Sequence, residues 1–461
     1  MSGLQYVVED RKADAVTHLA FARSQNTGNG ILGQKNTNDE GSCESSCLFF
    51  ILKGMGFMNK KWVILVLLML IIWGAMSTKK TYQQEKFESG INGSGELVRV
   101  LLKNDQFKGI THKTVRVSSL SGLYVNGRIE KGVYEIDSES DAFQGGTIRI
   151  EPIKTGEAIT IESIKRACET PTYEGVLDLY QTEEGIVIVN EVELESYLEN
   201  VVPSEMPATY EMEALKAQAV CARNYVYSHM NGMAYPEYNA NVDDSTSFQV
   251  YGNAKKHERT SEAVKSTEGI CLWYEGDMAV SYFYSTSCGR TAAASANAYL
   301  QSIEVKSETG DFYEEELPWY RWKTSIKKED LTHRLEQYTG KKIGDFCAFQ
   351  IEKEEESDRV QKIKVIGTDG EVQVESEYQI RDALGSPDTE IRLQNGSAVD
   401  GTELLPSAFF SVKEEKDRIL IEGGGYGHGV GMSQNAANEM AKDGMGYKEI
   451  LKFFYPGTTV Y

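Results

Sequence analysis

One carboxylate stands where the sequence predicts a rigid turn. Glu205 lies within Pro203–Pro207, between a short apolar helix expected over 192–201 and a second helix expected from about 211 to 230. A carboxyl group in partly apolar surroundings keeps its proton near neutral pH, which suits a general acid. A glutamate that caps the following helix is the alternative, and local chemistry leaves both interpretations open.

Six glycines surround a histidine near the end of the chain. The stretch Gly423–Gly431 contains no GxGxxG register, and no Gly-Lys-Ser/Thr follows it, so a nucleotide-binding loop is unsupported. Because glycine has no Cβ atom, backbone amides around His428 can approach a ligand closely. We interpret this stretch as part of a binding site, with a structural histidine as the alternative.

A third candidate is the hydroxyl-rich segment Ser285–Thr291, which follows a strand expected at Val280–Tyr284. Its small polar side chains suit hydrogen bonds to a polar ligand. Cys288 within it is a nucleophile, a metal ligand or a buried thiol. No ligand spacing among the cysteines and histidines supports a metal site, so we interpret Cys288 as a buried thiol.

Hydrophobic periodicity predicts the elements that hold these groups. Apolar residues at spacings of three and four predict the two helices named above and a last helix with Tyr447, Ile450, Leu451 and Phe454 on one face. Short alternating runs predict strands at 97–102, 114–118, 147–150 and 158–161, and a hairpin of 176–180 with 185–189. We expect an α+β, mixed β-rich extracytoplasmic domain with helices packed around an active-site groove.

Composition excludes several classes of protein. The 461 residues include 48 basic and 69 acidic side chains, a net charge of -21, which argues against nucleic acid as a partner. The seven cysteines form no CxxC clusters, so neither a disulfide framework nor a zinc finger is indicated.

An uncharged apolar run at 62–76 predicts a membrane anchor. It spans roughly 23 Å as a helix, and Lys60, Lys61, Lys79 and Lys80 flank it. Because Ala75-Met76-Ser77 is a poor cleavage site, we expect a single-pass anchor at 58–77 that is retained. The lysines before it favour an inside N-terminus, with the rest of the chain outside the cell membrane. We expect 1–57 to be an extension upstream of a true start at Met58, with a short cytoplasmic tail as the alternative. We expect 78–95 to be a linker.

Five segments together resemble the stage II sporulation protein D family, which includes the amidase-enhancer proteins. They follow one another in the family's order over roughly 97–461. The segments are Tyr197–Pro207, Glu213–Arg223, Gln249–Gly252, Phe283–Gly289, and the glycine-rich block with Met432–Gln434 closing in Tyr455–Thr458.

The resemblance implies a membrane-anchored peptidoglycan lytic transglycosylase that cleaves glycan strands stripped of stem peptides. It also implies a cell-wall amidase as partner during forespore engulfment in sporulation. Glu205 matches the family's catalytic glutamate. We expect substrate-binding or orienting roles for Gln218, Arg223, Ser285, Thr286, Ser287, Tyr426, His428, Ser433 and Gln434. The main rival is a peptidoglycan-binding protein that only stimulates an amidase, and a cysteine hydrolase using Cys288 with His428 is a third interpretation.

The sequence departs from the family pattern at one loop. Tyr284 stands where many relatives have a histidine, and Cys288 stands where many have a glycine. Some relatives bind zinc near this loop, and the missing histidine leads us to expect no cofactor and no metal here. Within the domain 96–461 we expect a β-rich part at 96–190, a catalytic core at 191–300 with 405–461, and an elaboration at 302–404.

Overall fold

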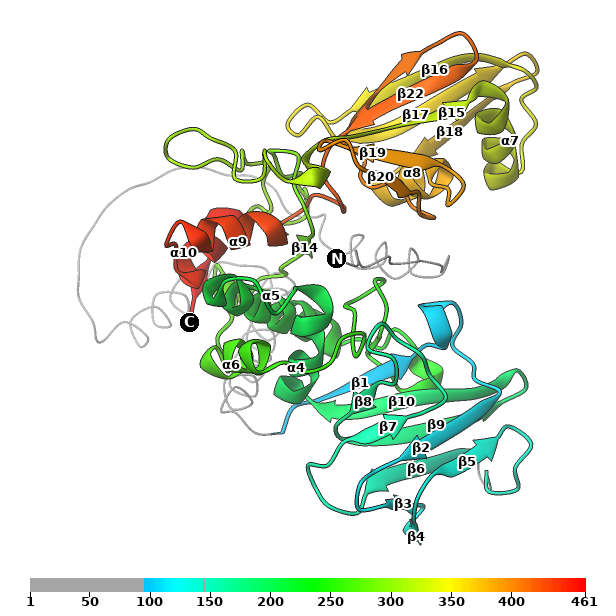
Figure 1. The fold of residues 1–461 in the computed structure, drawn as a ribbon, viewed down its shortest axis with the longest axis vertical. Coiled ribbons are helices and arrows are strands. Elements are labelled where there is room, and N and C mark those ends of the chain that lie inside the picture. Colours follow the sequence, from blue (N-terminus) through cyan, green and yellow to red (C-terminus); the bar gives the residue numbers. More distant parts are fainter. Residues whose placement is uncertain (1–94, 144–145) are drawn as a thin grey trace, which may run out of the picture. The chain divides into compact units, whose positions relative to one another are not determined.

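The computed structural model describes residues 95–143 and 146–461 (Figure 1). The predicted extension, the anchor at 62–76 and almost all of the linker lie outside these residues. Within the described part of the chain, no helix combines the length and apolar character needed to cross a bilayer. The described fold is mixed and β-rich, as predicted, with seven α-helices in those two ranges.

Alternating apolar residues build two sheets in the first part of the domain. All the strands predicted there are present, and β9 (Val176–Thr182) and β10 (Gly185–Glu193) form the predicted hairpin. A seven-stranded sheet has the order β11-β1-β10-β9-β6-β3-β4, and a four-stranded sheet has the order β5-β2-β7-β8. The other bounds are β1 Leu97–Leu102, β2 Thr114–Ser118, β3 Leu123–Val125, β4 Arg128–Glu130, β5 Tyr134–Asp137, β6 Thr147–Pro152, β7 Ile159–Ile161, β8 Thr172–Tyr173 and β11 Val242–Asp243.

Three helices follow these strands and pack on one another, α4 (Leu194–Glu205), α5 (Met212–Met230) and α6 (Glu258–Ser266) (Figure 1). The prediction that Pro203 ends the first helix is wrong, because α4 continues through Pro203 to Glu205. A proline in the last turn removes only the bond from its own nitrogen to the carbonyl of Glu199, and the packing of α4 tolerates that loss. Glu205 is therefore the last helical residue.

The end of the chain returns to these helices. Strand β14 (Phe283–Tyr284) pairs in parallel with β23 (Met432–Ser433), which leads into α9 (Gln434–Lys442) and α10 (Tyr447–Phe454). On α10, Ile450, Leu451 and Phe454 are buried, as the periodicity predicted. A small sheet, β13-β12-β24, joins Asp277–Met278, Leu272–Tyr274 and Thr459–Val460.

Between β14 and β23 the chain builds a region with its own apolar core. Its sheets have the orders β20-β19-β15-β22-β21 and β16-β17-β18, with α7 and α8 packed against them. The elaboration expected to end at 404 extends further, because β21 and β22 pair with β15 in one sheet. The bounds are β15 Trp322–Lys327, α7 Lys328–Thr339, β16 Phe346–Lys353, β17 Val360–Gly367, β18 Glu371–Glu375, α8 Glu377–Leu384, β19 Glu390–Leu393, β20 Ala398–Asp400, β21 Phe410–Glu414 and β22 Arg418–Gly423.

Candidate active site

The carboxyl group of Glu205 is held at the C-terminal end of α4. Its Oε1 accepts the backbone N–H of Val250 at 2.6 Å, and its side chain is partly exposed. The neighbouring Ser204 Oγ accepts the N–H groups of Asn253 and Ala254, both at 3.1 Å. The end of α4 is thus bonded to the segment 249–254, which contains the Gln249–Gly252 motif.

Buried charges fix the chain just before that segment. Asp244 pairs with Arg166 at 2.7 Å and Asp243 with Lys103 at 3.4 Å, and all four side chains are almost fully buried. Losing one partner of such a pair leaves an uncompensated buried charge, so these contacts strongly favour one arrangement. The turn that brings the Val250 N–H to Glu205 is therefore rigidly placed.

Two packing contacts complete this support. The hydroxyl of Tyr251 donates to Asn190 Oδ1 at 2.7 Å, which ties the segment to β10. Gly252 has φ +71°, and a Cβ atom there would lie 2.4 Å from the ring of Tyr173. Only glycine fits both the backbone conformation and the space.

The environment of Glu205 favours its protonated form. Burial raises the pKa of this carboxyl to about 7, and the Val250 hydrogen bond opposes the shift. Its position at the end of α4 acts in the same direction as burial, because a helix C-terminus disfavours negative charge. Helix α5 begins after Glu211, and Glu205 bonds Val250, so Glu205 does not cap α5. The arrangement suits a group that gives and takes a proton near neutral pH.

The hydroxyl-rich loop lies in a second polar cluster, around Glu314. The Ser287 backbone N–H and the Ser433 Oγ donate to Glu314 Oε1 at 3.0 and 2.8 Å, and Ser287 Oγ bonds Oε2. Asn435 Nδ2 donates to the Ser285 carbonyl and to Thr286 Oγ1. The structure therefore brings together four predicted residues, Ser285, Thr286, Ser287 and Ser433.

Glu314 is a carboxyl group that the sequence analysis missed. It is 1% exposed, and burial raises its pKa to about 7 against the opposing effect of its three donors. Its neighbours Glu315 and Glu316 make the local sequence look like a solvated acidic stretch. No local signal distinguishes it, because its partners come from β23 and from the loop after β14.

A hydrogen bond links this second cluster to the chain that follows Glu205. Tyr210 lies five residues after Glu205, and its hydroxyl donates to Asn435 Oδ1 at 2.5 Å. The backbone N–H of Glu211 donates to Asn438 Oδ1 at 2.8 Å, so α9 holds the connection between α4 and α5. Asn435 and Tyr210 were not among the predicted site residues.

Among the predicted residues of the glycine-rich block, His428 is bonded only to backbone. Its Nε2 lies 2.9 Å from the Phe283 carbonyl, and its Nδ1 accepts the Val430 N–H at 3.1 Å. Burial lowers its pKa to about 4, so the ring is neutral at pH 7. Tyr426 exchanges backbone hydrogen bonds with Thr286 and packs its ring on Trp319. Both residues position the hydroxyl-rich loop, and a substrate contact by either stays a prediction.

The two predicted residues of α5 also have protein partners. Gln218 is fully buried, and its Oε1 accepts from Gln434 Nε2 at 3.3 Å, while its own Nε2 has no partner within the described chain. Arg223 is fully buried and bonds both carboxylate oxygens of Glu195 at 2.7 Å. Arg223 therefore ties α5 to the start of α4, and Gln218 joins α5 to the first residue of α9.

Cys288 is buried for the most part, and burial raises its pKa to about 11, so it carries a neutral thiol at pH 7. In residues 95–143 and 146–461, no three His, Cys, Asp or Glu side chains cluster as metal ligands. The expectation that the protein needs no zinc stays a prediction.

Comparisons with known proteins agree with the motifs. A family described as Stage II sporulation protein matches residues 182–274, which contain Glu205 and the Val250 segment. The Stage II sporulation protein D of Bacillus subtilis is 32% identical over 336 residues, which are 65% of this chain and 86% of that protein. The chain belongs to the stage II sporulation protein D family. The match to that relative spans most of its length, so membership does not depend on a shared motif alone.

Two other relatives match this chain at slightly lower identity and over different shares of their own length. The Amidase enhancer of Bacillus subtilis is 29% identical over 301 residues, and the chain spans only 40% of its length. An uncharacterized protein of Brachyspira hyodysenteriae is 28% identical over 379 residues, 88% of its length. Residues 291–431, which contain Glu314, match a family described as Domain of unknown function (DUF8618).

Proposed function

We propose that this family member is a membrane-anchored, extracytoplasmic peptidoglycan lytic transglycosylase that cleaves glycan strands free of stem peptides. One observation carries the proposal: Glu205 lies partly exposed at the end of α4 with a single backbone donor on Oε1, in surroundings whose burial raises the pKa of its carboxyl group to about 7. An acid–base group works best when its pKa lies near the working pH.

The chemistry needs one carboxyl group. Because the Val250 N–H occupies Oε1, the proton of neutral Glu205 sits on Oε2, from which it passes to the glycosidic oxygen as the C1–O bond breaks. The C6 hydroxyl oxygen of the sugar that contains C1 then bonds to C1, and the Glu205 carboxylate takes the proton of that hydroxyl. The product is a 1,6-anhydro sugar, and Glu205 ends as protonated as it began.

A conventional glycosidase uses two carboxyl groups on either side of the scissile bond. Glu314 does not fit that second role, because it is 1% exposed and its oxygens are bonded to Ser287 and Ser433. An intramolecular nucleophile removes the need for it. In this proposal the hydroxyl-rich loop contacts the sugar's hydroxyl and N-acetyl groups, and Glu314 holds that loop in place.

A second candidate function is peptidoglycan binding that stimulates a partner amidase without cleavage. The observation that favours it is the relative named Amidase enhancer. In either case the family name suggests a role in sporulation, and the name of the relative called Amidase enhancer suggests an amidase as partner. We propose that this partner is an amidase of the engulfment machinery.

The test is mass spectrometry of products from stem-peptide-free glycan strands, with wild type and Glu205→Gln compared. Glutamine keeps the oxygen that accepts the Val250 N–H but has no proton to transfer. General acid–base catalysis is worth about 100- to 10,000-fold, so the variant is expected to release 1,6-anhydro products at least about 100-fold more slowly. It is expected to fold and to bind strands like wild type.

Glu211→Gln is the matched control, because Glu211 is exposed and lies six residues away at the start of α5. It is expected to release products at the wild-type rate. Release of 1,6-anhydro products by Glu205→Gln at a near-normal rate shows that Glu205 is not the acid–base group. A wild type that releases nothing but accelerates an added amidase supports the binding-protein function instead.

A further inference from the structure

Strand β4, the last strand of the seven-stranded sheet, has one long edge without a partner strand in the described chain (Figure 1). It pairs with β3, and all three of its residues, Arg128, Ile129 and Glu130, are exposed. Two more large apolar side chains, Leu120 and Val133, are exposed just before β3 and just after β4. The edge therefore combines exposed apolar side chains with unpaired backbone groups, which together form a template for another strand.

The backbone groups of Ile129 point away from β3. The loop of the β3–β4 hairpin is the two-residue turn Asn126–Gly127, in which both residues have positive φ, 47° and 77°, as in a type I′ turn. In such a hairpin the pair next to the turn, Val125 with Arg128, is hydrogen-bonded. The next pair, Tyr124 with Ile129, is not hydrogen-bonded, so the N–H and C=O of Ile129 face the outer edge. A strand added at this edge can bond both groups.

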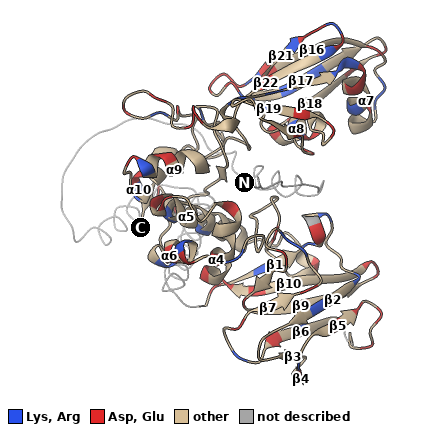
Figure 2. Cartoon of the chain, in the orientation of Figure 1, with Lys and Arg blue, Asp and Glu red and all other residues tan. Residues whose placement is uncertain are grey.

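The charged side chains of β4 are unmatched. On β3, the residue opposite Arg128 is Val125. The residue opposite Glu130 is Leu123, so both charges face buried apolar side chains. Charged residues of both signs are abundant on the described chain (Figure 2), yet neither Arg128 nor Glu130 has an ion-pair partner among residues 95–143 and 146–461. The outer edge of β4 is where opposite charges can be added.

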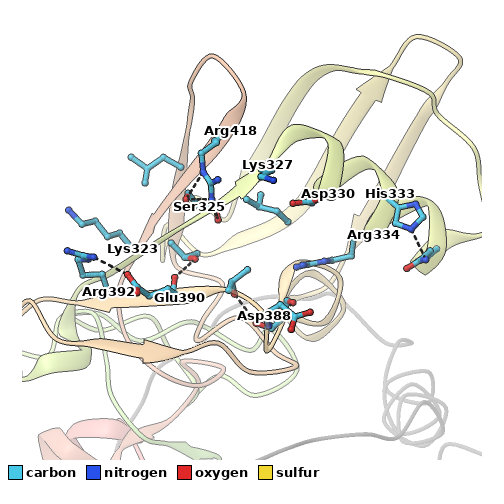
Figure 3. A pocket seen from close by; sticks show the side chains of 16 residues that line it. Lys323, Ser325, Lys327, Asp330, His333, Arg334, Asp388, Glu390, Arg392 and Arg418 are labelled. Carbon is cyan, nitrogen blue, oxygen red and sulfur yellow. Dashed lines mark hydrogen bonds and ion pairs between the residues drawn. The ribbon is translucent and has the colours of Figure 1, made fainter.

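Charges on other strands show how such residues are matched within this chain. Arg116 of β2 lies opposite Glu135 of β5, and their side chains form an ion pair at 3.5 Å. A hollow of about 950 Å³ on the sheet of β15, β19 and β22 is lined by charges of both signs, and Arg392 bonds Glu390 there at 3.0 Å (Figure 3). The unmatched charges of β4 depart from this pattern.

The order Arg128-Ile129-Glu130 is complementary to itself in an antiparallel pair. When a second copy of β4 lies antiparallel with Ile129 opposite Ile129, Arg128 of each copy lies opposite Glu130 of the other, and opposite charges on facing residues stabilise a sheet. The two Ile129 residues exchange N–H···O bonds, because their backbone groups point outward. Lys131 lies opposite Gly127 in this register, so no like charges meet. A two-fold axis through Ile129 thus gives an isologous contact that matches both charges of the strand.

We propose that β4 pairs with β4 of a second copy of this chain and joins two seven-stranded sheets edge to edge. Edge strands that resist pairing often carry lysines, which repel a second copy, whereas β4 carries one charge of each sign about an apolar residue. A pairing of three residues buries less than the roughly 1,200 Å² of a stable interface, so the dimer is weak in solution. Confinement of both copies to one membrane by the proposed anchor raises their effective concentration. The contact does not depend on Glu205 or on the proposed reaction.

The test traps the pair through a cysteine placed on the two-fold axis. Residues of a hydrogen-bonded antiparallel pair have Cα atoms about 5.5 Å apart, which is within the range of a disulfide. Purified full-length Ile129→Cys in detergent micelles is therefore expected to form disulfide-linked dimers under copper phenanthroline faster than wild type, whose own cysteines set the background. Met233→Cys is the matched control, because Met233 is 44% exposed and lies in the loop after α5. It is expected to form dimers no faster than wild type.

Charge reversal in the Ile129→Cys background tests the register. Arg128→Glu places like charges opposite each other at both ends of the pair, and Glu130→Arg does the same. Each reversal is expected to slow dimer trapping about tenfold, since two attractive cross-strand pairs become repulsive. An equimolar mixture of the two reversed variants is expected to form mixed dimers at the unreversed rate, because every acidic side chain then faces a basic one. Mass spectrometry distinguishes mixed dimers from dimers of one variant.

Three results overturn the proposal. Ile129→Cys that is trapped no faster than Met233→Cys shows that the edge does not pair with a second copy. Trapping that neither reversal slows shows a contact without this register. A mixture that forms mixed dimers no faster than each reversed variant dimerises alone shows that Arg128 and Glu130 do not face each other across the pair. Unchanged melting midpoints establish that each variant is folded, and product release from denuded glycan strands is expected to stay at the wild-type level in all of them.

Discussion

Glu314→Gln tests the buried carboxyl that joins the region 291–431 to the hydroxyl-rich loop. Glutamine has nearly the same shape, its oxygen can accept the Ser287 N–H, and its NH₂ group can donate to the Ser433 or Ser287 hydroxyl. The substitution therefore keeps the packing and removes only the titration. Any change in stability that depends on pH must then come from the ionisation of this one group.

The magnitude follows from the pKa of about 7 in the folded protein against an ordinary value of 4.5. A raised carboxyl pKa stabilises the folded state at low pH, and that contribution is lost as pH rises through 7. Between pH 5 and pH 8 the loss amounts to about 2.5 kcal/mol for a single group with these two pKa values. Between pH 5 and pH 8, the free energy of unfolding of wild type is therefore expected to fall by about 2.5 kcal/mol relative to that of Glu314→Gln.

The assay compares melting midpoints of wild type and variant at pH 5 and pH 8 in matched buffers. Taking the difference between the two proteins at each pH cancels every other titrating group, Glu205 included. For a folded unit of this length, about 2.5 kcal/mol corresponds to about 3 °C. The melting midpoint of Glu314→Gln minus that of wild type is expected to be about 3 °C larger at pH 8 than at pH 5.

Glu315→Gln provides the control, because the adjacent Glu315 is exposed. Its midpoint is expected to follow wild type at both pH values. The prediction is refuted if the difference in melting midpoint between wild type and Glu314→Gln is the same at pH 5 and pH 8. Glu314 then does not titrate between these pH values in the folded protein.

Three further substitutions test the support of the site. Arg223→Gln removes the buried partner of Glu195, and a lower melting midpoint is expected from a loss of about 3 kcal/mol; an unchanged midpoint contradicts this. Cys288→Ser is expected to keep near-normal product release, since its thiol is neutral at pH 7, and an abolished reaction argues for a thiol mechanism. Gly252→Ala is expected to cost more than about 1 kcal/mol and to slow product release, because its Cβ meets the Tyr173 ring; wild-type melting and release contradict that clash.

Local periodicity was sufficient for the strands before Glu205 and for helices α5 and α10, but not for the end of α4, which carries Glu205. Strands β2, β6 and β7 alternate because one face of each is buried, whereas β10 is a nearly continuous apolar run because both of its faces are buried. The spacing of apolar residues on α5 and α10 reflects their buried faces. Sequence motifs identified Glu205 and the Val250 segment as one set. They did not show that the contact between them is a backbone hydrogen bond, because a backbone N–H has no sequence signature.

The remaining features depend on contacts between distant residues. Glu314 differs from Glu315 only in what surrounds it, 27 residues from Ser287 and 119 from Ser433. Arg223 was expected to orient Glu205 or to contact substrate because it lies on the helix after Glu205. Its pairing with Glu195 instead depends on how α5 packs on α4. The end of the inserted region was misjudged for the same reason, since the pairing of β22 with β15 spans nearly a hundred residues.

The continuation of α4 through Pro203 changes the chemical interpretation of Glu205. Had the helix ended at Pro203, the carboxyl would stand in a turn, where nearby N–H groups stabilise its charged form. As the last residue of α4 it faces the negative end of a helix and has one N–H donor, from Val250. A second donor would lower its pKa and leave it unable to protonate a leaving group. With no donor it would hold its proton too tightly to act as a base, so the single hydrogen bond sets a balance that suits both steps.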